Sequence, residues 1–406
     1  MAKFWYTAKN QSGETRGGEM IAPDEKALAK QLRSEGYILT SVKEIEGERK
    51  AVSVKFLDRF KKVSLKEKMM FTRNLAVMVA SGVSITRAMN NLALQTKDKT
   101  FQNILKDIRS ELESGKQLSE GLAKYPGTFG DLFVNMVRVG EVGGNLDEVL
   151  AIVATQLEKE HDLTSKVRGA LIYPAVVLTA MVGIAILMLT YVLPQIMGVF
   201  KDMAVTLPAS TQFIVNISDF LRAHAITSTV IMVAFVVGVR LALGTKIGKR
   251  IMSLVLIKMP LISGLVIKIN CARFARILSS LLKSGVSVID ALRIIGETLT
   301  NYYYRQELIG SIEEVKKGLP LSKVIYRNPK IFPILIPQML EVGEETGETE
   351  KVMLKLAEFY EDEVNNITKN MSSIVEPILM LLIGGAVGFF AVAMMQPMYS
   401  VMQNIQ

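Results

Sequence analysis

The densest group of potentially reactive side chains is an acidic cluster between residues 341 and 350. It contains five carboxylates: Glu341, Glu344, Glu345, Glu348 and Glu350. Carboxylate oxygens are preferred ligands of hard divalent cations, so a cation site is one interpretation. The two alternatives are a solvated helix start, where carboxylates favour the N-terminal dipole, and an acidic surface for a protein partner.

A sparser acidic group occurs earlier in the chain, at Glu141, Asp147 and Glu148. Glu141 and Asp147 are weak candidates for metal ligands, and no metal site is predicted from them. Glu376 is the only charged residue between Asn370 and Gln406. A carboxylate within a membrane segment is a candidate for a proton or ion role. Interfacial solvation and pairing within an oligomer are the alternatives, because Glu376 follows Lys369 closely.

Familiar catalytic arrangements are missing from the sequence. Two histidines, His161 and His224, and a single cysteine, Cys271, leave little for a His/Cys metal centre and allow no intrachain disulfide. The phosphate-binding motifs GxxxxGK[ST] and GxGxxG do not occur, nor do HExxH, GxSxG or CxxC. We therefore predict a protein that is not an enzyme and that needs no cofactor.

Two long uncharged segments exclude a purely soluble protein. Residues 169–200 and 377–406 carry no charged side chain, and a spanning helix needs only about 20 apolar residues. Membrane spans are expected at about 171–194, 225–243 and 374–395. Arg240 lies near one end of the second span, where its side chain can reach the headgroups.

The positive charges predict an orientation. They cluster before the first span and after the second: Lys159, Lys166, Arg168, Arg240, Lys246, Lys249, Arg250 and Lys258. Because positive residues favour the cytoplasmic side, the N-terminus and both large polar segments are expected in the cytoplasm and the C-terminus outside. Anionic lipid beside the spans then accounts for much of the net charge of +9, so direct nucleic-acid binding is not predicted.

The chain repeats itself with a constant offset of 203 residues. Phe71-Thr-Arg73 matches Phe274-Ala-Arg276, and 274 − 71 is 203. The same offset pairs Ser81 and Gly82 with Ser284 and Gly285, Gly140 and Glu141 with Gly343 and Glu344, Gly144 with Gly347, Pro174 with Pro377, and Pro194 with Pro397. Glycine and proline have specific backbone roles, so chance does not explain these matches.

Each copy is predicted to be a bundle of about six helices that leads into a membrane helix. Ser64-Leu-Lys-Glu67 is a capping-box pattern that begins the first helix, which ends near Ser81-Gly82. The remaining helices of the first copy are expected at 85–94, 101–114, 119–125, 131–139 and 146–161. Pro174 and Pro377 are expected in the first turns of their membrane helices, as structural punctuation.

The N-terminal segment differs from the rest, because residues 4–8 and 15–21 read as two short strands of a hairpin. A helix is expected from about residue 23 to Ser34, before Gly36. The predicted boundaries are 1–45 for this hairpin/helix module, 46–63 for a linker, 64–168 for the first cytoplasmic helical domain, 169–196 for the first span, 197–223 for an external loop, 224–243 for the second span, 244–370 for the second helical domain (repeating the first from about 267), 371–396 for the third span and 397–406 for an external tail.

Two tandem helical domains with three spans resemble the type II secretion system protein F and type IV pilus PilC family. The residues that carry the likeness are Ala272-Arg273-Phe274-Ala275-Arg276 through Val286, Val139-Gly140-Glu141 through Leu146, Val342-Gly343-Glu344 through Gly347, and Lys166 through Pro174 to Pro194. Thr349 departs from the pattern, since the first copy has Leu146 there. A metal or contact site of the first domain is therefore not transferred to the second.

The resemblance implies a scaffold in the bacterial inner membrane, part of a type IV pilus assembly machine. Its implied partners are a cytoplasmic hexameric assembly ATPase, with a retraction ATPase as an additional candidate, pilins or pseudopilins, other inner-membrane assembly proteins, the lipid bilayer, and further copies of itself, with a dimer favoured. A pseudopilus platform for type II secretion and a DNA-uptake pilus platform are alternatives. A small membrane transporter or channel is the alternative from another class.

Overall fold

The computed structural model describes residues 2–10, 15–22, 24–45, 63–202, 208–260 and 262–404. The chain divides into two compact units, Met1–Lys62 and Val63–Gln406, and each is described by itself. Nearly all of the predicted linker 46–63 lies outside the described residues.

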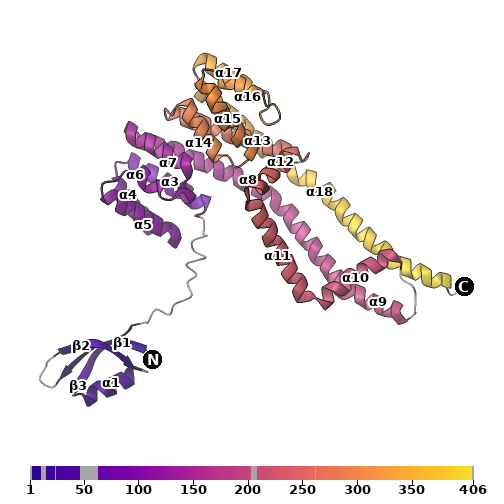
Figure 1. Ribbon diagram of the computed structural model, residues 1–406, viewed down its shortest axis with the longest axis horizontal. Helices are drawn as coiled ribbons and strands as arrows, with labels where there is room; N and C mark the ends of the chain where they lie inside the picture. The colour runs from indigo at the N-terminus through magenta and orange to yellow at the C-terminus, as the bar shows by residue number, and fades with distance from the viewer. Residues whose placement is uncertain are drawn as a thin grey trace. The chain divides into compact units, whose positions relative to one another are not determined.

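The first unit is a three-stranded antiparallel sheet with one helix (Figure 1). Its elements are β1 (Ala2–Asn10), β2 (Thr15–Ala22), α1 (Glu25–Ser34) and β3 (Tyr37–Ile45), in the sheet order β2-β1-β3. Leu28 and Leu32 of α1 pack with Tyr6 and Ala8 of β1 in a small core. The predicted hairpin and helix are present, and β3 is a third strand that the sequence analysis did not assign.

The second unit begins with six helices, the number predicted for one copy of the repeat. They are α3 (Leu65–Ala80), α4 (Ile85–Gln95), α5 (Lys99–Glu113), α6 (Leu118–Ala123), α7 (Pro126–Gly143) and α8 (Leu146–Leu187). Ser64 begins α3 with the predicted capping box. The Ser64 hydroxyl oxygen accepts the backbone N–H of Glu67 at 3.2 Å, and the Glu67 carboxylate accepts the backbone N–H of Ser64 at 3.3 Å. Gly130, with φ +70°, separates the first turn of α7 from the rest.

The second copy has the same six elements. They are α13 (Ser263–Lys283), α14 (Val288–Thr298), α15 (Tyr302–Lys316), α16 (Leu321–Tyr326), α17 (Leu335–Thr346) and α18 (Thr349–Asn404). The elements between the copies are a π-helical turn (Met188–Val192), α9 (Leu193–Asp202), α10 (Ala209–Ala223), α11 (Ala225–Gly244) and α12 (Lys246–Lys258). Most of the described chain is helical, as predicted.

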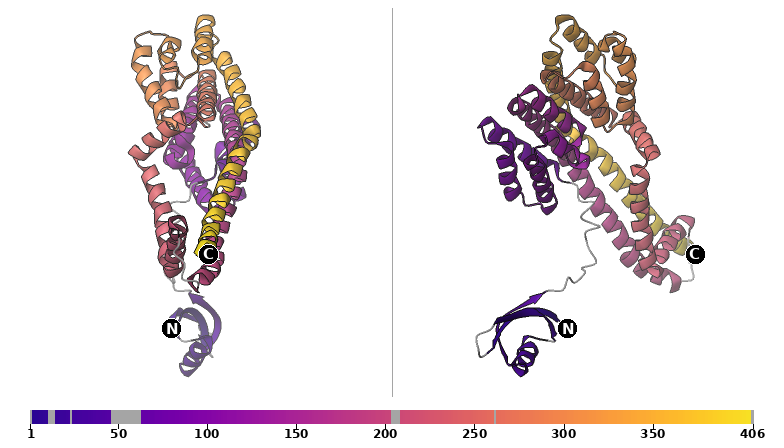
Figure 2. Two further views of the ribbon diagram at one scale, coloured as in Figure 1. Left: turned by 90° about the vertical axis from the view of Figure 1, so that its right-hand side faces the viewer. Right: turned by 60° about the vertical axis from the view of Figure 1, so that its left-hand side comes forward.

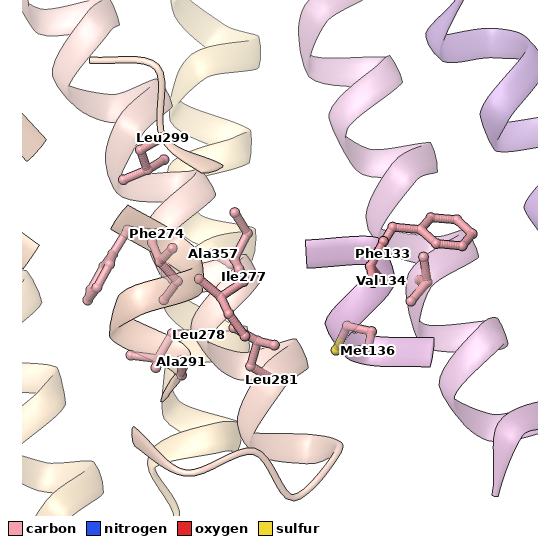
Figure 3. Close-up of a cluster of buried hydrophobic side chains, with 14 of the residues drawn as sticks. Phe133, Val134, Met136, Phe274, Ile277, Leu278, Leu281, Ala291, Leu299 and Ala357 are labelled. Atoms are coloured by element: carbon pink, nitrogen blue, oxygen red, sulfur yellow. The ribbon is translucent and has the colours of Figure 1, made fainter. Parts of the chain in front are cut away.

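One continuous hydrophobic core serves both copies. It joins Phe71, Phe101 and Phe133 of the first copy to Phe274 and Phe332 of the second. Figure 3 shows part of this core, with side chains of α7 on one side and side chains of the second copy, including Phe274, Ile277 and Leu281, on the other. The two copies therefore fold together around one core and are not two separate domains.

Three helices of the described chain are long and apolar enough to cross a membrane: Leu146–Gly198, Ala225–Gly244 and Thr349–Gln396. The bent pair α12 and α13 is a further candidate, with an angle of 111° between its halves. However, α13 is buried in the core of the second copy. Figures 1 and 2 show the repeats at one end of the three spans and α9 and α10 at the other.

Two features differ from the sequence expectation. The membrane helices do not begin near Pro174 and Pro377, because α8 and α18 run without interruption from the repeats through both prolines. The expected external loop 197–223 contains a helix, α10, of 15 residues. Since α10 contacts both the π-helical turn and α18, it is a structural part of the membrane bundle.

Candidate functional site: repeat corners and the inter-repeat seam

Glu141 caps a helix that has no cap of its own. The short helix α6 follows Gln117, whose side chain makes no capping hydrogen bond. The backbone N–H groups of Leu118 and Ser119 instead donate to the two carboxylate oxygens of Glu141, the second at 3.0 Å. A helix start leaves such N–H groups without partners, and a carboxylate also favours the positive end of the helix dipole.

Glu344 does the same work in the second copy. The helix α16 follows Pro320, which offers no side-chain cap. Glu344 accepts the N–H of Leu321 at 2.6 Å, the N–H of Ser322 at 3.3 Å and the Ser322 hydroxyl. Both family-motif glutamates therefore connect the end of one helix to the start of another.

The glycines around these glutamates form the corner that leads into the long helix. Gly144 and Gly347 end α7 and α17 with φ of +71° and +72°, a left-handed conformation that favours glycine. A Cβ on Gly140 would lie 3.0 Å from Val149, and one on Gly343 would lie 2.8 Å from the Cα of Thr349. The motif therefore permits close contact between α7 and α8, and between α17 and α18.

Ser81-Gly82 and Ser284-Gly285 end the first helix of each copy. Gly82 and Gly285 have φ of +78° and +80°. The N–H of Val83 donates to the carbonyl of Met78, and the N–H of Val286 donates to that of Leu281, as in a Schellman cap. These repeated residues position helices, and we assign no chemistry to them.

The remaining acidic residues of 341–350 lie on the surface. Glu348 pairs with Lys351 at the start of α18, while Glu341 and Glu345 are exposed. In the described part of the chain, no three His, Cys, Asp or Glu side chains are grouped as metal ligands would be. Asp147 lies in the first turn of α8, where a carboxylate favours the helix dipole.

A cluster of ion pairs lies where α8 of the first copy meets α13 and α18 of the second. Arg273 of α13 donates to Glu160 of α8 with two guanidinium nitrogens, Nε at 3.0 Å. Arg276, also on α13, donates to both oxygens of Glu361 on α18, each at 2.8 Å. Lys159 of α8 approaches the same Glu361 at 3.8 Å. We call these five residues the inter-repeat seam.

The Arg276–Glu361 pair, which joins two helices of the second copy, is the most buried ion pair of the seam. The two side chains are 8% and 17% exposed, whereas those of Arg273 and Glu160 are 23% and 28% exposed. A bidentate guanidinium–carboxylate pair fixes direction as well as distance. In the first copy the equivalent of Arg276 is Arg73, which is exposed and makes no ion pair with another described residue. The two copies therefore differ at this position, because the second has a buried ion pair where the first has an exposed arginine.

Sequence reasoning found only part of this seam. Arg273, Phe274 and Arg276 were candidate residues, and Phe274 is fully buried in the core against Phe332. Glu160 and Glu361 were missed. The repeat offset contained a signal, because Glu158-Lys-Glu160 matches Glu361-Asp-Glu363, but it gives no partner for either glutamate.

The sole cysteine is structural. Cys271 is fully buried, with its sulfur 3.8 Å from the Tyr304 hydroxyl oxygen. Burial raises the pKa of the thiol to about 12, and burial also raises the pKa of Tyr304 above its usual range. The thiol therefore stays protonated at neutral pH and is a poor nucleophile.

At the far end of the membrane helices, α10 replaces hydrogen bonds that proline removes. In the π-helical turn, the N–H of Leu193 donates to the carbonyl of Met188. The Leu189 carbonyl then lacks its usual donor, and the next residue along, Pro194, has no N–H. The hydroxyl of Ser218 on α10 donates to the Leu189 carbonyl instead.

The second copy shows the same compensation. Pro397 cannot donate to the carbonyl of Ala393, four residues earlier in α18. The hydroxyl of Thr211 on α10 donates to this carbonyl at 2.6 Å, in a fully buried position. Thr211 and Ser218 lie seven residues apart on one face of α10. We call these two residues the hydroxyl clamp; neither was predicted.

The other candidate residues of the membrane segments are Pro174, Pro194, Glu376 and Pro377. Pro174 is buried inside α8, and Pro194 lies half-buried in the first turn of α9. Glu376 and Pro377 are exposed on α18, and Glu376 forms no ion pair with a described residue.

Comparison with known proteins matches the repeat boundaries. The family model "Type II secretion system (T2SS), protein F" matches twice, at residues 71–194 and 274–397, which differ by the offset of 203. The model "Type II secretion system protein F, N-terminal domain" matches residues 1–43. The chain belongs to the type II secretion system protein F family. Three similar proteins of this family show how its names divide between pilus assembly and secretion.

The type IV pilus assembly protein PilC of Thermus thermophilus is 32% identical over all of this chain and 99% of its own length. The type IV pilus assembly protein PilC of Myxococcus xanthus is 31% identical over all of this chain and 96% of its own. The type II secretion system protein F of Vibrio cholerae is 31% identical over 98% of both. The chain is thus an inner-membrane platform protein of pilus or secretion machinery, in a family of structural proteins.

Proposed function

We propose that this chain is the platform of a type IV pilus assembly machine, where it couples cytoplasmic assembly and retraction ATPases to the insertion or extraction of pilins. The observation that carries the proposal is the continuity of α8 and α18, which run from the repeats into the membrane. A force applied to the soluble repeats therefore reaches the membrane helices directly. The pseudopilus platform of type II secretion is the alternative, since both names occur among the relatives.

The membrane bundle offers a place for an apolar helix. A cavity of about 620 Å³ lies between α8, α10 and α18, lined almost wholly by apolar side chains. Val176, Ile184, Phe213, Ile383 and Phe390 contribute to its wall. We propose that the apolar helix of a pilin occupies this cavity on its way between bilayer and fibre.

The orientation proposed from the charges places the repeats in the cytoplasm. It is supported by the position of both repeats at one end of the spans (Figure 2). In the sequence, Lys166 and Arg168 precede the apolar part of α8, and Lys246 follows α11. A periplasm-active reporter fused after Gln406 tests it. Activity of that fusion agrees with the proposal, and activity only in a cytoplasmic reporter at the same site contradicts it.

Copies of the chain are proposed to associate through faces that the repeat leaves open. Beside the inter-repeat seam, the hydroxyl of Ser280 on α13 lies 3.4 Å from the side-chain amide oxygen of Gln156 on α8. The equivalent positions are Phe359 on α18 and Val77 on α3, at an offset of 203. Phe359 is 48% and Val77 61% exposed. We propose that α18 of one chain packs on α3 of the next chain, in the way that α8 packs on α13 within a single chain.

Disulfide cross-linking tests this contact in native membranes. Differently tagged copies that carry Val77→Cys and Phe359→Cys are expected to cross-link with each other, and neither with itself. The control pairs Phe359→Cys with Val142→Cys, which is 79% exposed on α7. Cys271 is too deeply buried to compete. A Val77–Val77 cross-link would indicate a two-fold contact and would contradict the proposal.

Co-purification with the assembly ATPase tests the function itself. The full chain, solubilised and tagged, is expected to retain the assembly ATPase. Deletion of the gene for this chain is expected to abolish pili while secretion continues. Loss of type II secretion with normal pili would establish the alternative. Failure to retain any ATPase, with the chain well folded, would contradict both.

A further inference from the structure

The helix α12 has the pattern of a helix that lies on a membrane surface. It follows the span α11 directly. Its large apolar residues at four-residue spacing, Ile247, Ile251, Val255 and Met259, are 72%, 56%, 48% and 46% exposed. Basic residues share the same helix: Lys246, Lys249, Arg250 and Lys258. An amphipathic basic helix of this kind buries its apolar face at the headgroup level.

On the other side of α12 from these apolar residues lies a partly open pocket of about 310 Å³. The end of α11, α12 and α13 enclose it, together with the residues that precede α15. Its polar lining residues are Lys249, Ser253, Asn270, Arg273, Thr300 and Asn301. Its apolar lining residues are Leu243, Met252, Leu256, Val266 and Ile269. A pocket that combines polar and apolar groups fits an amphiphilic ligand.

Asn270 supplies an acceptor that nothing in the described chain satisfies. The side chain is 4% exposed. Its amide nitrogen donates to the Val266 carbonyl at 2.7 Å, but its amide oxygen is buried without a partner. Reversing the amide would place two oxygens against each other. A buried acceptor without a donor costs about 1–3 kcal/mol, so a ligand that brings a donor is favoured here.

The other polar groups supply donors. Ser253 accepts the N–H of Tyr302 at 3.2 Å and Asn301 accepts the N–H of Tyr303 at 3.0 Å. The hydroxyl hydrogen of Ser253 and the amide hydrogens of Asn301 are left to donate. Lys249 is exposed and forms no ion pair with a described residue, whereas Arg273 is neutralised by Glu160. The pocket therefore carries one net positive charge, several donors and one acceptor.

We propose that this pocket binds the headgroup of a phospholipid whose phosphate ester also carries an N–H or O–H donor. Lys249, Ser253 and Asn301 face the phosphate, and the ammonium or hydroxyl of the headgroup donates to the oxygen of Asn270. The acyl chains pass over Met252 and Leu256 to the bilayer beside α11. Phosphatidylethanolamine and phosphatidylglycerol meet this description, whereas phosphatidylcholine has no donor.

Native mass spectrometry of the full chain in detergent tests the site. Phosphatidylethanolamine or phosphatidylglycerol is expected to remain bound, one molecule for each chain, and phosphatidylcholine is not expected to displace it. Lys249→Gln is expected to reduce the bound fraction about fivefold, the effect of one lysine near a lipid surface. The matched control is Lys258→Gln, a basic residue of α12 that does not line the pocket. Equal loss in both variants would indicate nonspecific attraction and would overturn the proposal.

Two further experiments test the role of Asn270 and distinguish a bound lipid from a soluble phosphate ester. Asn270→Leu removes the acceptor at similar volume, so it is expected to abolish the preference over phosphatidylcholine while leaving the lipid-free melting temperature unchanged or higher. Glycerophosphoethanolamine, the same headgroup without acyl chains, is expected to compete poorly. Competition by this headgroup equal to that of the lipid would show a soluble phosphate-ester site and would overturn the assignment to lipid. An unchanged headgroup preference in Asn270→Leu would overturn the role of Asn270.

Discussion

At the scale of single residues, the family motifs are explained by capping and packing. Glu141 and Glu344 each satisfy the first N–H groups of a six-residue helix that has no cap of its own. Such a helix is too short to persist without tertiary support. The glutamates therefore decide whether α6 and α16 form, and thereby how each bundle turns towards its long helix.

Removing this cap is expected to be costly. Glu141→Ala and Glu344→Ala should each lower the free energy of unfolding by about 1–3 kcal/mol, because buried N–H groups lose a charged partner. Denaturant unfolding of the full chain in detergent, followed by circular dichroism, measures the change. Glu345→Ala is the control, since this exposed neighbour caps nothing. Equal stability of Glu344→Ala and Glu345→Ala would contradict the capping role.

The seam residue Arg276 provides a matched comparison with its repeat partner, Arg73. Arg276→Ala leaves Glu361 buried with only Lys159 nearby, so a loss of about 3–5 kcal/mol is expected. Arg73→Ala removes an exposed side chain, for which a change within about 0.5 kcal/mol is expected. Thermal unfolding of both variants measures the difference. Similar melting temperatures for the two would show that the Arg276–Glu361 pair does not stabilise the packing of α13 on α18.

At the scale of elements, α10 holds the two repeat-derived spans together. Thr211 and Ser218 donate to carbonyls that Pro397 and Pro194 leave without partners. Leu193, Met197, Ile214 and Ala393 pack around these bonds in a separate apolar cluster. The prolines therefore create two acceptors, and one helix supplies both donors.

Loss of the hydroxyl clamp is expected to release α10. The double variant Thr211→Ala with Ser218→Ala should increase amide hydrogen exchange across residues 209–223, because each lost bond contributes about 1 kcal/mol. The control is Thr229→Ala in α11, whose hydroxyl bonds only within its own helix. Exchange that is unchanged in the double variant, relative to this control, would count against the clamp.

The local elements were predictable because their signals are local. The capping box at Ser64, the glycine helix ends and the six-helix pattern of each copy all depend on neighbouring residues. The seam could not be predicted, since Glu160 and Arg273 are 113 residues apart and periodicity gives no partner across that distance. The helix α10 was missed because an apolar, hydroxyl-rich segment between two spans resembles a loop.

The continuity of α8 was only partly visible. Pro174 indicated a helix start, because proline interrupts the hydrogen-bond ladder of an isolated helix. In the structure, the helix passes through the buried Pro174, and α18 likewise passes through the exposed Pro377. A proline removes one hydrogen bond of the ladder, and the residue type alone does not indicate whether the turns on either side keep a long helix continuous.

At the scale of the whole molecule, the two copies share one hydrophobic core, and α8 and α18 extend from it into the membrane. The 42 residues of α8 extend about 63 Å at 1.5 Å per residue. The shared core and the inter-repeat seam keep α8 and α18 side by side at the repeat end, and α10 fixes them at the other. A displacement of the repeats therefore moves both spans together, which is the central claim of the proposed function.

A two-glycine insertion after Lys166 tests this claim most directly. The insertion interrupts α8 between the repeat and the membrane, while two glycines inserted after Lys97, in the loop between α4 and α5, provide the control. The first variant is expected to reach normal protein levels, retain the ATPase and assemble no fibres, whereas the control is expected to assemble them. Normal fibre assembly by the Lys166 variant at normal protein levels would show that the repeats do not act on the membrane through a continuous α8.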